Sequence, residues 1–132
     1  MKLTVAAKKS LQFNKMRNYQ QLLIWQKGMD LVEQVYLLVA SFPAEERFGL
    51  RSQLTRAATS IPSNIAEGSS RGSEKDYKRF IEIALGSAFE VETQLLITVR
   101  VGLSSPPAAE PALGLVREEQ MMLQSFLRRL GG

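Results

Sequence analysis

The residues of this sequence that could do chemistry form a polar line within residues 51–72. At about 100° per residue, their spacing of three or four positions places them on one side of a helix, within a sector of roughly 80°. Apolar residues of the same period, such as Leu54, Ile61 and Ile65, run beside the line. Two interpretations are open: a hydrogen-bond network within the fold, or a polar pocket or lining of an oligomer's central surface. The line consists of Gln53, Arg56, Ser60, Asn64, Glu67 and Arg71.

A proline, Pro62, interrupts this stretch at its middle. Proline lacks a backbone N–H donor and strains the carbonyl four residues earlier. We therefore predict that the helix is kinked near residues 58–62, or that it starts again with Pro62 in its first turn. If the polar line is structural, Ser60 or Asn64 should bond to the freed backbone groups and Arg56 to a carboxylate. Gly68 is predicted to end the helix.

The composition argues against an enzyme. The chain has no cysteine and no histidine, which removes a thiolate nucleophile, Cys-ligated zinc and the commonest general base. The sequence GSSRG at 68–72 is not preceded by a strand and lacks the Lys-Ser/Thr pair of a phosphate loop. An anion could still rest at the amides near Ser73, beside Arg71 and Lys75, although a simple turn explains the same residues. We expect no catalytic residue, no metal and no cofactor.

The charge is concentrated at the N-terminus. The chain has 17 basic and 13 acidic residues. Five of the basic residues and none of the acidic ones lie in residues 1–18, so this segment carries +5 and the remainder, with 12 bases and 13 acids, carries −1. We predict a basic extension over 1–18, which either attracts phosphate or is a solvated terminus. The candidate phosphate contacts are Lys2, Lys8, Lys9, Lys15, Arg17, Arg71 and Lys75.

The periodicity of apolar residues predicts four helices: 19–41, the central stretch up to Gly68, 74–101 and 113–130. Three prolines within 102–112 predict a loop there. Because no strand pattern occurs, we expect an all-α fold, an antiparallel up-down four-helix bundle over 19–132 with its second helix kinked at Pro62. With no membrane-spanning run and no signal peptide, the protein is expected to be cytoplasmic.

The third helix has more apolar surface than one bundle needs. A second apolar line lies about 100° round the helix from the main one, and a monomer rarely tolerates a large exposed patch. Aromatic residues are also enriched at subunit contacts. Small residues around Gly86 are predicted to permit a close helix approach. The candidate oligomer interface comprises Trp25, Leu85, Phe89 and Leu96.

Several motifs carry a family resemblance. IWQKGMDLVEQVY (24–36), FPAEERFGLRSQL (42–54), RAATSIPSNIAEGSSR (56–71) and RFIEIALGSAFEVETQL (79–95) occur in this order. Over roughly residues 22–103 the chain resembles a small bacterial family of four-helix-bundle proteins whose genes occur in intervening sequences of 23S ribosomal RNA. The resemblance implies an antiparallel bundle, a homopentamer and a link to RNA. The accessory protein of diversity-generating retroelements, which engages nucleic acid and a reverse transcriptase, looks like a more distant relative.

Two functions are therefore expected. The first is a non-enzymatic oligomeric scaffold that binds RNA or an RNA-handling protein, which the resemblance and the basic extension favour. The second is a protein-interaction module without a nucleic-acid role, whose grooves receive a partner helix. The bundle is nearly neutral and shows no clear interleaving of base-stacking aromatic residues with its basic ones, which favours the second. Salt distinguishes them, because phosphate binding weakens steeply as salt rises.

Overall fold

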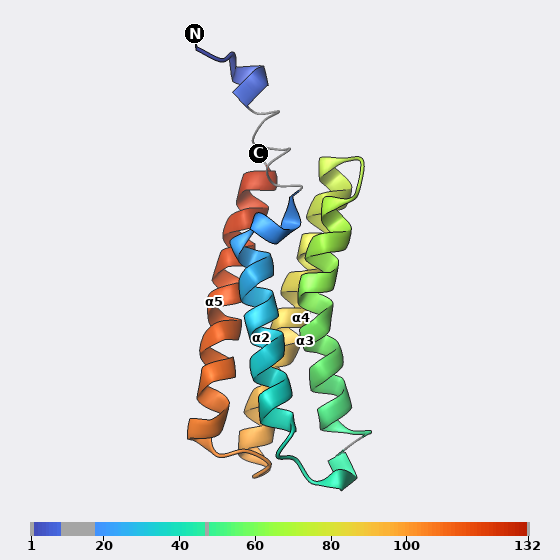
Figure 1. Ribbon diagram of the computed structural model, residues 1–132, viewed down its shortest axis with the longest axis vertical. Helices are drawn as coiled ribbons and strands as arrows, with labels where there is room; N and C mark the ends of the chain where they lie inside the picture. Colours follow the sequence, from blue (N-terminus) through green and yellow to red (C-terminus); the bar gives the residue numbers. More distant parts are fainter. Residues whose placement is uncertain (1, 9–17, 47, 132) are drawn as a thin grey trace.

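The computed structural model describes residues 2–8, 18–46 and 48–131. Within these residues four long helices pack together and no strand occurs, which confirms the all-α four-helix bundle. Each helix runs antiparallel to the next, so α2 and α4 lie at opposite corners, each beside α3 and α5 (Figure 1). The elements are η1 (Tyr19–Gln21), α2 (Leu23–Val39), η2 (Ala44–Glu46), α3 (Leu50–Ser69), α4 (Glu74–Arg100) and α5 (Pro106–Leu130).

The apolar faces of the four helices meet in one core. On α3, the residues Leu54, Ile61 and Ile65 are fully buried. The rings of Tyr77 on α4 and Phe126 on α5 lie 5.7 Å apart. This core contains the apolar stripes that the sequence predicts, because residues three or four apart share one helix face.

The first helix is shorter than the predicted span 19–41. Residues 19–21 form a separate 3-10 turn, and Leu22, with ψ 132°, is extended before α2 begins. Residues 5–8 are helical, and Ala7 donates its backbone N–H to Thr4 Oγ1 at 3.0 Å. The predicted phosphate contacts Lys9, Lys15 and Arg17 lie outside the described residues.

Helix α3 passes through Pro62 without a break, so the prediction of a second helix starting at Pro62 is wrong. The missing hydrogen bond costs about 3 kcal/mol, whereas each large apolar side chain that α3 buries contributes about 1.5–3 kcal/mol. The kink concerns the angle of the helix axis and stays a prediction. Gly68 also lies inside the helix and does not end it. The C-cap is Ser70, which has right-handed backbone angles.

Helix α5 begins at Pro106, so the predicted loop over 102–112 is correct for residues 102–105 and wrong for residues 106–112. Ser105 caps the helix by accepting the N–H of Ala108 at 3.2 Å. The first turn of a helix has no intrahelical partner for its N–H groups, and prolines at its first two positions therefore cost no hydrogen bond. Only Pro111, further along the helix, removes one. By contrast, the predicted cap of α4 is confirmed, because Asp76 donates its N–H to Ser73 Oγ at 3.1 Å.

The close approach of α3 and α4 occurs at Gly68. A Cβ atom on Gly68 would lie 2.7 Å from Cβ of Phe80 and 3.2 Å from Cδ1 of Tyr77. At Gly86, where the sequence analysis predicts close packing, a Cβ would meet nothing within 4 Å. Gly86 itself is therefore not a point of close approach within this chain, because it lies on the exposed side of α4, whereas the small residues Ala84 and Ala88 beside it are fully buried.

These two glycines give a matched pair of variants. We expect Gly68→Ala to destabilise the protein by about 1–3 kcal/mol, because the new methyl group overpacks against Phe80. Gly86→Ala should stabilise it by about 0.5–1 kcal/mol, because alanine favours the helix and meets no neighbour. Urea unfolding at constant m-value measures both changes. Equal effects of the two variants would contradict this assignment of the close approach.

Candidate functional site

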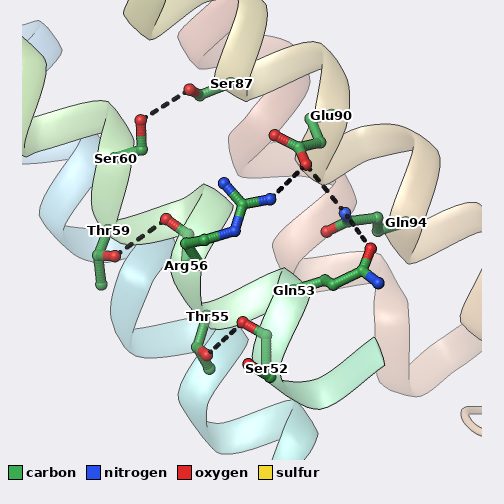
Figure 2. A network of polar contacts seen from close by, with 9 residues as sticks. All are labelled: Ser52, Gln53, Thr55, Arg56, Thr59, Ser60, Ser87, Glu90 and Gln94. Atoms are coloured by element: carbon green, nitrogen blue, oxygen red, sulfur yellow. Dashed lines mark hydrogen bonds and ion pairs between the residues drawn. The ribbon is translucent and has the colours of Figure 1, made fainter. Parts of the chain in front are cut away.

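Part of the polar line on α3 forms a network with α4 (Figure 2). Arg56 Nη2 lies 2.8 Å from Glu90 Oε2. Gln94 Nε2 donates to the same Glu90 oxygen at 3.2 Å and to Gln53 Oε1 at 3.4 Å. Arg56 is thus paired with a carboxylate, as the structural interpretation predicts. The polar groups of Gln53 and Arg56 thus bond to side chains of α4.

A second group of contacts lies one turn further along α3. The hydroxyl groups of Ser60 and Ser87 are 2.8 Å apart, and Asn64 Nδ2 donates to the carbonyl oxygen of Ser60 at 2.8 Å and to its hydroxyl at 2.9 Å. The carbonyl that Pro62 leaves without a donor belongs to Ala58. Asn64 therefore bonds to a different carbonyl from the one that the structural interpretation predicts.

The last two residues of the line are separate from the network. Arg71, which follows the C-cap of α3, has its Nη2 3.3 Å from Oε1 of Glu67, four residues earlier. Its guanidinium lies 4.6 Å from the centre of the Phe80 ring. The six residues of the line thus do not converge on one site. Gln53, Arg56 and Ser60 bond to α4, and Asn64 bonds to Ser60 within α3. Glu67 with Arg71 lies at the C-terminal end of α3.

Basic side chains gather at the end of the bundle where α3 passes into α4. The last turn of α5 and the start of α2 lie at the same end (Figure 1). Lys78 belongs to this end as well, since its Nζ would lie 3.5 Å from a Cβ on Gly131. The acidic residues there are Glu67, Glu74 and Asp76. We call the six basic residues the basic end: Arg71, Lys75, Lys78, Arg79, Arg128 and Arg129.

Most of the basic end is exposed and unpaired. Lys75, Lys78, Arg79 and Arg128 are exposed, and none of them has an ion-pair partner among the residues that the structure describes. Of the predicted phosphate contacts, Arg71 and Lys75 therefore belong to a larger cluster. Lys2 and Lys8 are exposed on the N-terminal segment.

A buried carboxyl group, Glu119 on α5, was not predicted from the sequence. Its exposed fraction is 0%, and neither carboxyl oxygen has a hydrogen-bond partner within the described part of the chain. Burial, followed by the negative charge of Glu118, raises the pKa of Glu119 to about 8, and the charge of Lys27 opposes this rise. A signal was available: Glu119 lies three residues after Val116, so it shares the buried face of α5.

Another polar cluster joins α4 to α5. The carboxylate of Glu92 accepts hydrogen bonds from Arg117 Nε at 2.9 Å and from Gln120 Nε2 at 3.0 Å. The bond from Gln120, followed by that from Arg117, lowers the pKa of Glu92. Glu92 is therefore held as a carboxylate by its partners. Like the α3–α4 network, this cluster joins two neighbouring helices.

The four candidate interface residues divide into two pairs. Trp25 and Leu85 are partly buried against the core, and the Trp25 ring lies 5.5 Å from that of Tyr19. Phe89 and Leu96 are 46% and 47% exposed. Leu96 also lines a groove of about 640 Å³ between α4 and α5. The other lining residues are Thr93, Ile97, Val99, Arg100, Pro106, Glu110, Leu113 and Arg117.

The residues that the structure describes contain no group of three or more acidic side chains that could hold a metal ion. None of their helices combines the length and apolar character needed to cross a membrane.

The structural interpretation of the polar line predicts unequal effects on stability. Ser60→Ala should cost about 1–2 kcal/mol, because it leaves the partly buried partners Ser87 and Asn64 without a hydroxyl. Arg56→Ala should cost less than about 1 kcal/mol, because its ion pair is largely exposed. Thermal or urea unfolding gives both values. A larger loss for Arg56→Ala than for Ser60→Ala is the outcome that this interpretation does not allow.

Comparison with known proteins places the chain in a family. A solved structure of a protein with unknown function from the S23 ribosomal protein family of Bacteroides thetaiotaomicron is similar, with a TM-score of 0.72 and 23% sequence identity. The similarity covers 80% of this chain and 98% of the other, and it shows a shared fold. No curated protein matches the chain. The profile of the 23S rRNA-intervening sequence protein family matches residues 20–125. The chain therefore belongs to the 23S rRNA-intervening sequence protein family.

Proposed function

We propose that this protein is a non-enzymatic, self-associating helical scaffold that binds RNA through phosphate contacts at its basic end. The observation that carries the proposal is a cluster, at one end of the bundle, of four exposed cations without ion-pair partners among the described residues: Lys75, Lys78, Arg79 and Arg128. Phosphate groups are the natural partners of such side chains, because binding releases condensed counterions from the nucleic acid. The family name connects its members with 23S rRNA, which supports RNA as the nucleic acid.

The N-terminal segment adds to the same end. Tyr19 begins the first described turn of the bundle, and α2 starts at the basic end (Figure 1). The segment of residues 1–18 is therefore attached there, with the exposed side chains of Lys2 and Lys8. The attraction of one copy is limited by nearby acidic residues such as Glu74 and Asp76. Several copies bound to one RNA would raise the avidity without any new contact.

Exposed apolar residues on α4 support the self-association in this proposal. Phe89, Leu96 and Ile97 are each more than 40% exposed, although they belong to a helix that has already filled its core face. A second copy is the occupant we propose for this face, and the family resemblance makes a ring of five the expected assembly. Exposed apolar patches of this kind are typical of interaction sites.

The RNA-binding part of the proposal predicts where charge matters. Lys75→Ala combined with Lys78→Ala should weaken RNA binding and reduce the slope of log affinity against log salt by about one unit for each lost phosphate contact. Arg51→Ala with Arg100→Ala removes two exposed cations from the opposite end and serves as the matched control. Deleting residues 1–15 should act in the same direction as the first variant. Mobility-shift titrations at two salt concentrations measure these effects.

Two results would contradict RNA binding at the basic end. One is equal weakening by both double variants, which would leave only a general effect of net charge. The other is the absence of any salt-sensitive shift for the full chain with structured or single-stranded RNA. The second result favours the alternative function, a protein-interaction module whose α4–α5 groove receives an apolar partner helix.

Self-association predicts a mass above that of one subunit in light scattering after size exclusion. Phe89→Glu with Leu96→Glu should dissociate the assembly, because two charges would be buried at the contact. Leu37→Glu is the matched control: Leu37 is also exposed, at 63%, but it lies on α2. A wild-type protein with the mass of one subunit excludes the scaffold, and a dimer excludes the ring of five.

A further inference from the structure

Three helices meet at one point in the bundle interior, between Gly28 on α2, Pro62 on α3 and Glu119 on α5. A Cβ atom on Gly28 would lie 3.0 Å from Glu119 Oε2, 3.4 Å from Ile61 Cγ2 and 3.5 Å from Pro62 Cδ. The Glu119 carboxyl group and the Pro62 ring therefore lie against the same position of α2. The absence of a side chain at Gly28 leaves the room that the carboxyl group occupies.

Two buried polar groups at this place are without their usual hydrogen-bond partner. Pro62 has no N–H, so the carbonyl oxygen of Ala58 receives no hydrogen bond from four residues ahead. Ala58 is fully buried, so water does not replace that bond. The proline Cδ atom takes the position of the missing hydrogen and lies next to this carbonyl. Glu119, for its part, has two buried oxygens without a partner among the described residues.

We propose that Glu119 is a carboxylic acid in the folded bundle and that its O–H group donates a hydrogen bond to the carbonyl oxygen of Ala58. A protonated carboxyl group is a donor, whereas a carboxylate can only accept. One bond would thus satisfy both groups and join α5 to α3 beside Pro62. Loss of the proton would turn the contact into a repulsion between two acceptors. This hydrogen bond forms only while Glu119 is protonated, which makes the stability of the bundle sensitive to pH.

No charged neighbour provides another way to satisfy Glu119. On α2, Lys27 is the nearest cation, and its Nζ lies 3.2 Å from Glu118 Oε1. Glu118 itself, next to Glu119 on α5, adds negative charge. From α3, the uncharged side chains of Ile61 and Pro62 lie beside the same position of Gly28. On α4, the carboxylate of Glu92 is paired with Arg117 and Gln120, which belong to α5.

The pH dependence follows from the direction of the pKa change. Burial raises the pKa of Glu119 from its ordinary value of 4.5 to about 8. Between these two pH values the folded state keeps the proton of Glu119, whereas the unfolded chain has released it. The contribution of Glu119 to the stability of the fold is therefore fully present below pH 4.5 and is lost as the pH rises towards 8. Over this interval the unfolding constant should increase by up to tenfold for each pH unit.

The first test compares unfolding of the wild-type protein and Glu119→Gln between pH 5 and 9. Glutamine keeps a donor at this position but does not titrate, so this variant should lose the steep part of the pH dependence. It should also be more stable than the wild type above pH 8. An unchanged pH dependence in Glu119→Gln overturns the proposal.

The second test separates the bond to Ala58 from burial alone. Pro62→Ala restores a backbone N–H for the Ala58 carbonyl, so that carbonyl no longer needs Glu119 as its donor. The factor by which Glu119→Met raises the unfolding constant at pH 6 should therefore be at least ten times larger in the wild type than in the Pro62→Ala background. Equal effects in both backgrounds overturn the bond. If a variant does not fold, infrared spectra of wild-type protein with isotope-labelled glutamate decide the question at pH 6. A band of a hydrogen-bonded, protonated carboxyl group is expected, and its absence overturns the proposal.

Discussion

The burial of α3 between α2 and α4 is the constraint on which the rest of the structure depends. Its buried residues, including Leu54, Ile61 and Ile65, continue through Pro62 without a break. Gly68 lets α4 approach closely at the far end of α3. With this face buried, the polar line of α3 lies along its edge with α4, where Arg56 pairs with Glu90 across the two helices. Gln53, Arg56 and Ser60 on this line bond to side chains of α4.

The same packing determines where recognition can occur. Charged side chains are excluded from the core and lie along the surface of the bundle. Those at the start of α4 and at the end of α5 are distant in sequence but lie at the same end of the bundle. Lys75 and Arg128 illustrate this, because they belong to α4 and α5 but lie at one end of the bundle. Their charges are free of ion pairs within the described residues, in contrast to Arg56 and Arg117. This difference explains why the proposed RNA contact lies at the basic end and not on the polar line.

Local signals predicted most of the fold but only part of the candidate site. The four helices and the Ser73 cap follow from periodicity and from one short motif. The start of α5 was mispredicted because Pro106 fits the first turn of a helix as well as a loop. The partners of Glu119 and the basic end depend on helices distant in sequence, so they require the three-dimensional arrangement. The position of Glu119 on the apolar face of α5 was visible, but not what surrounds it.

Ultraviolet crosslinking of the full chain to RNA at low salt, followed by mass spectrometry of the crosslinked peptides, tests the central claim most directly. The account predicts crosslinks within residues 70–79 and 126–131, which contain the basic end, and within the N-terminal segment. Crosslinks confined to the opposite end, at residues 44–51 and 100–110, would contradict it. So would the absence of any crosslink under conditions in which the protein forms its assembly.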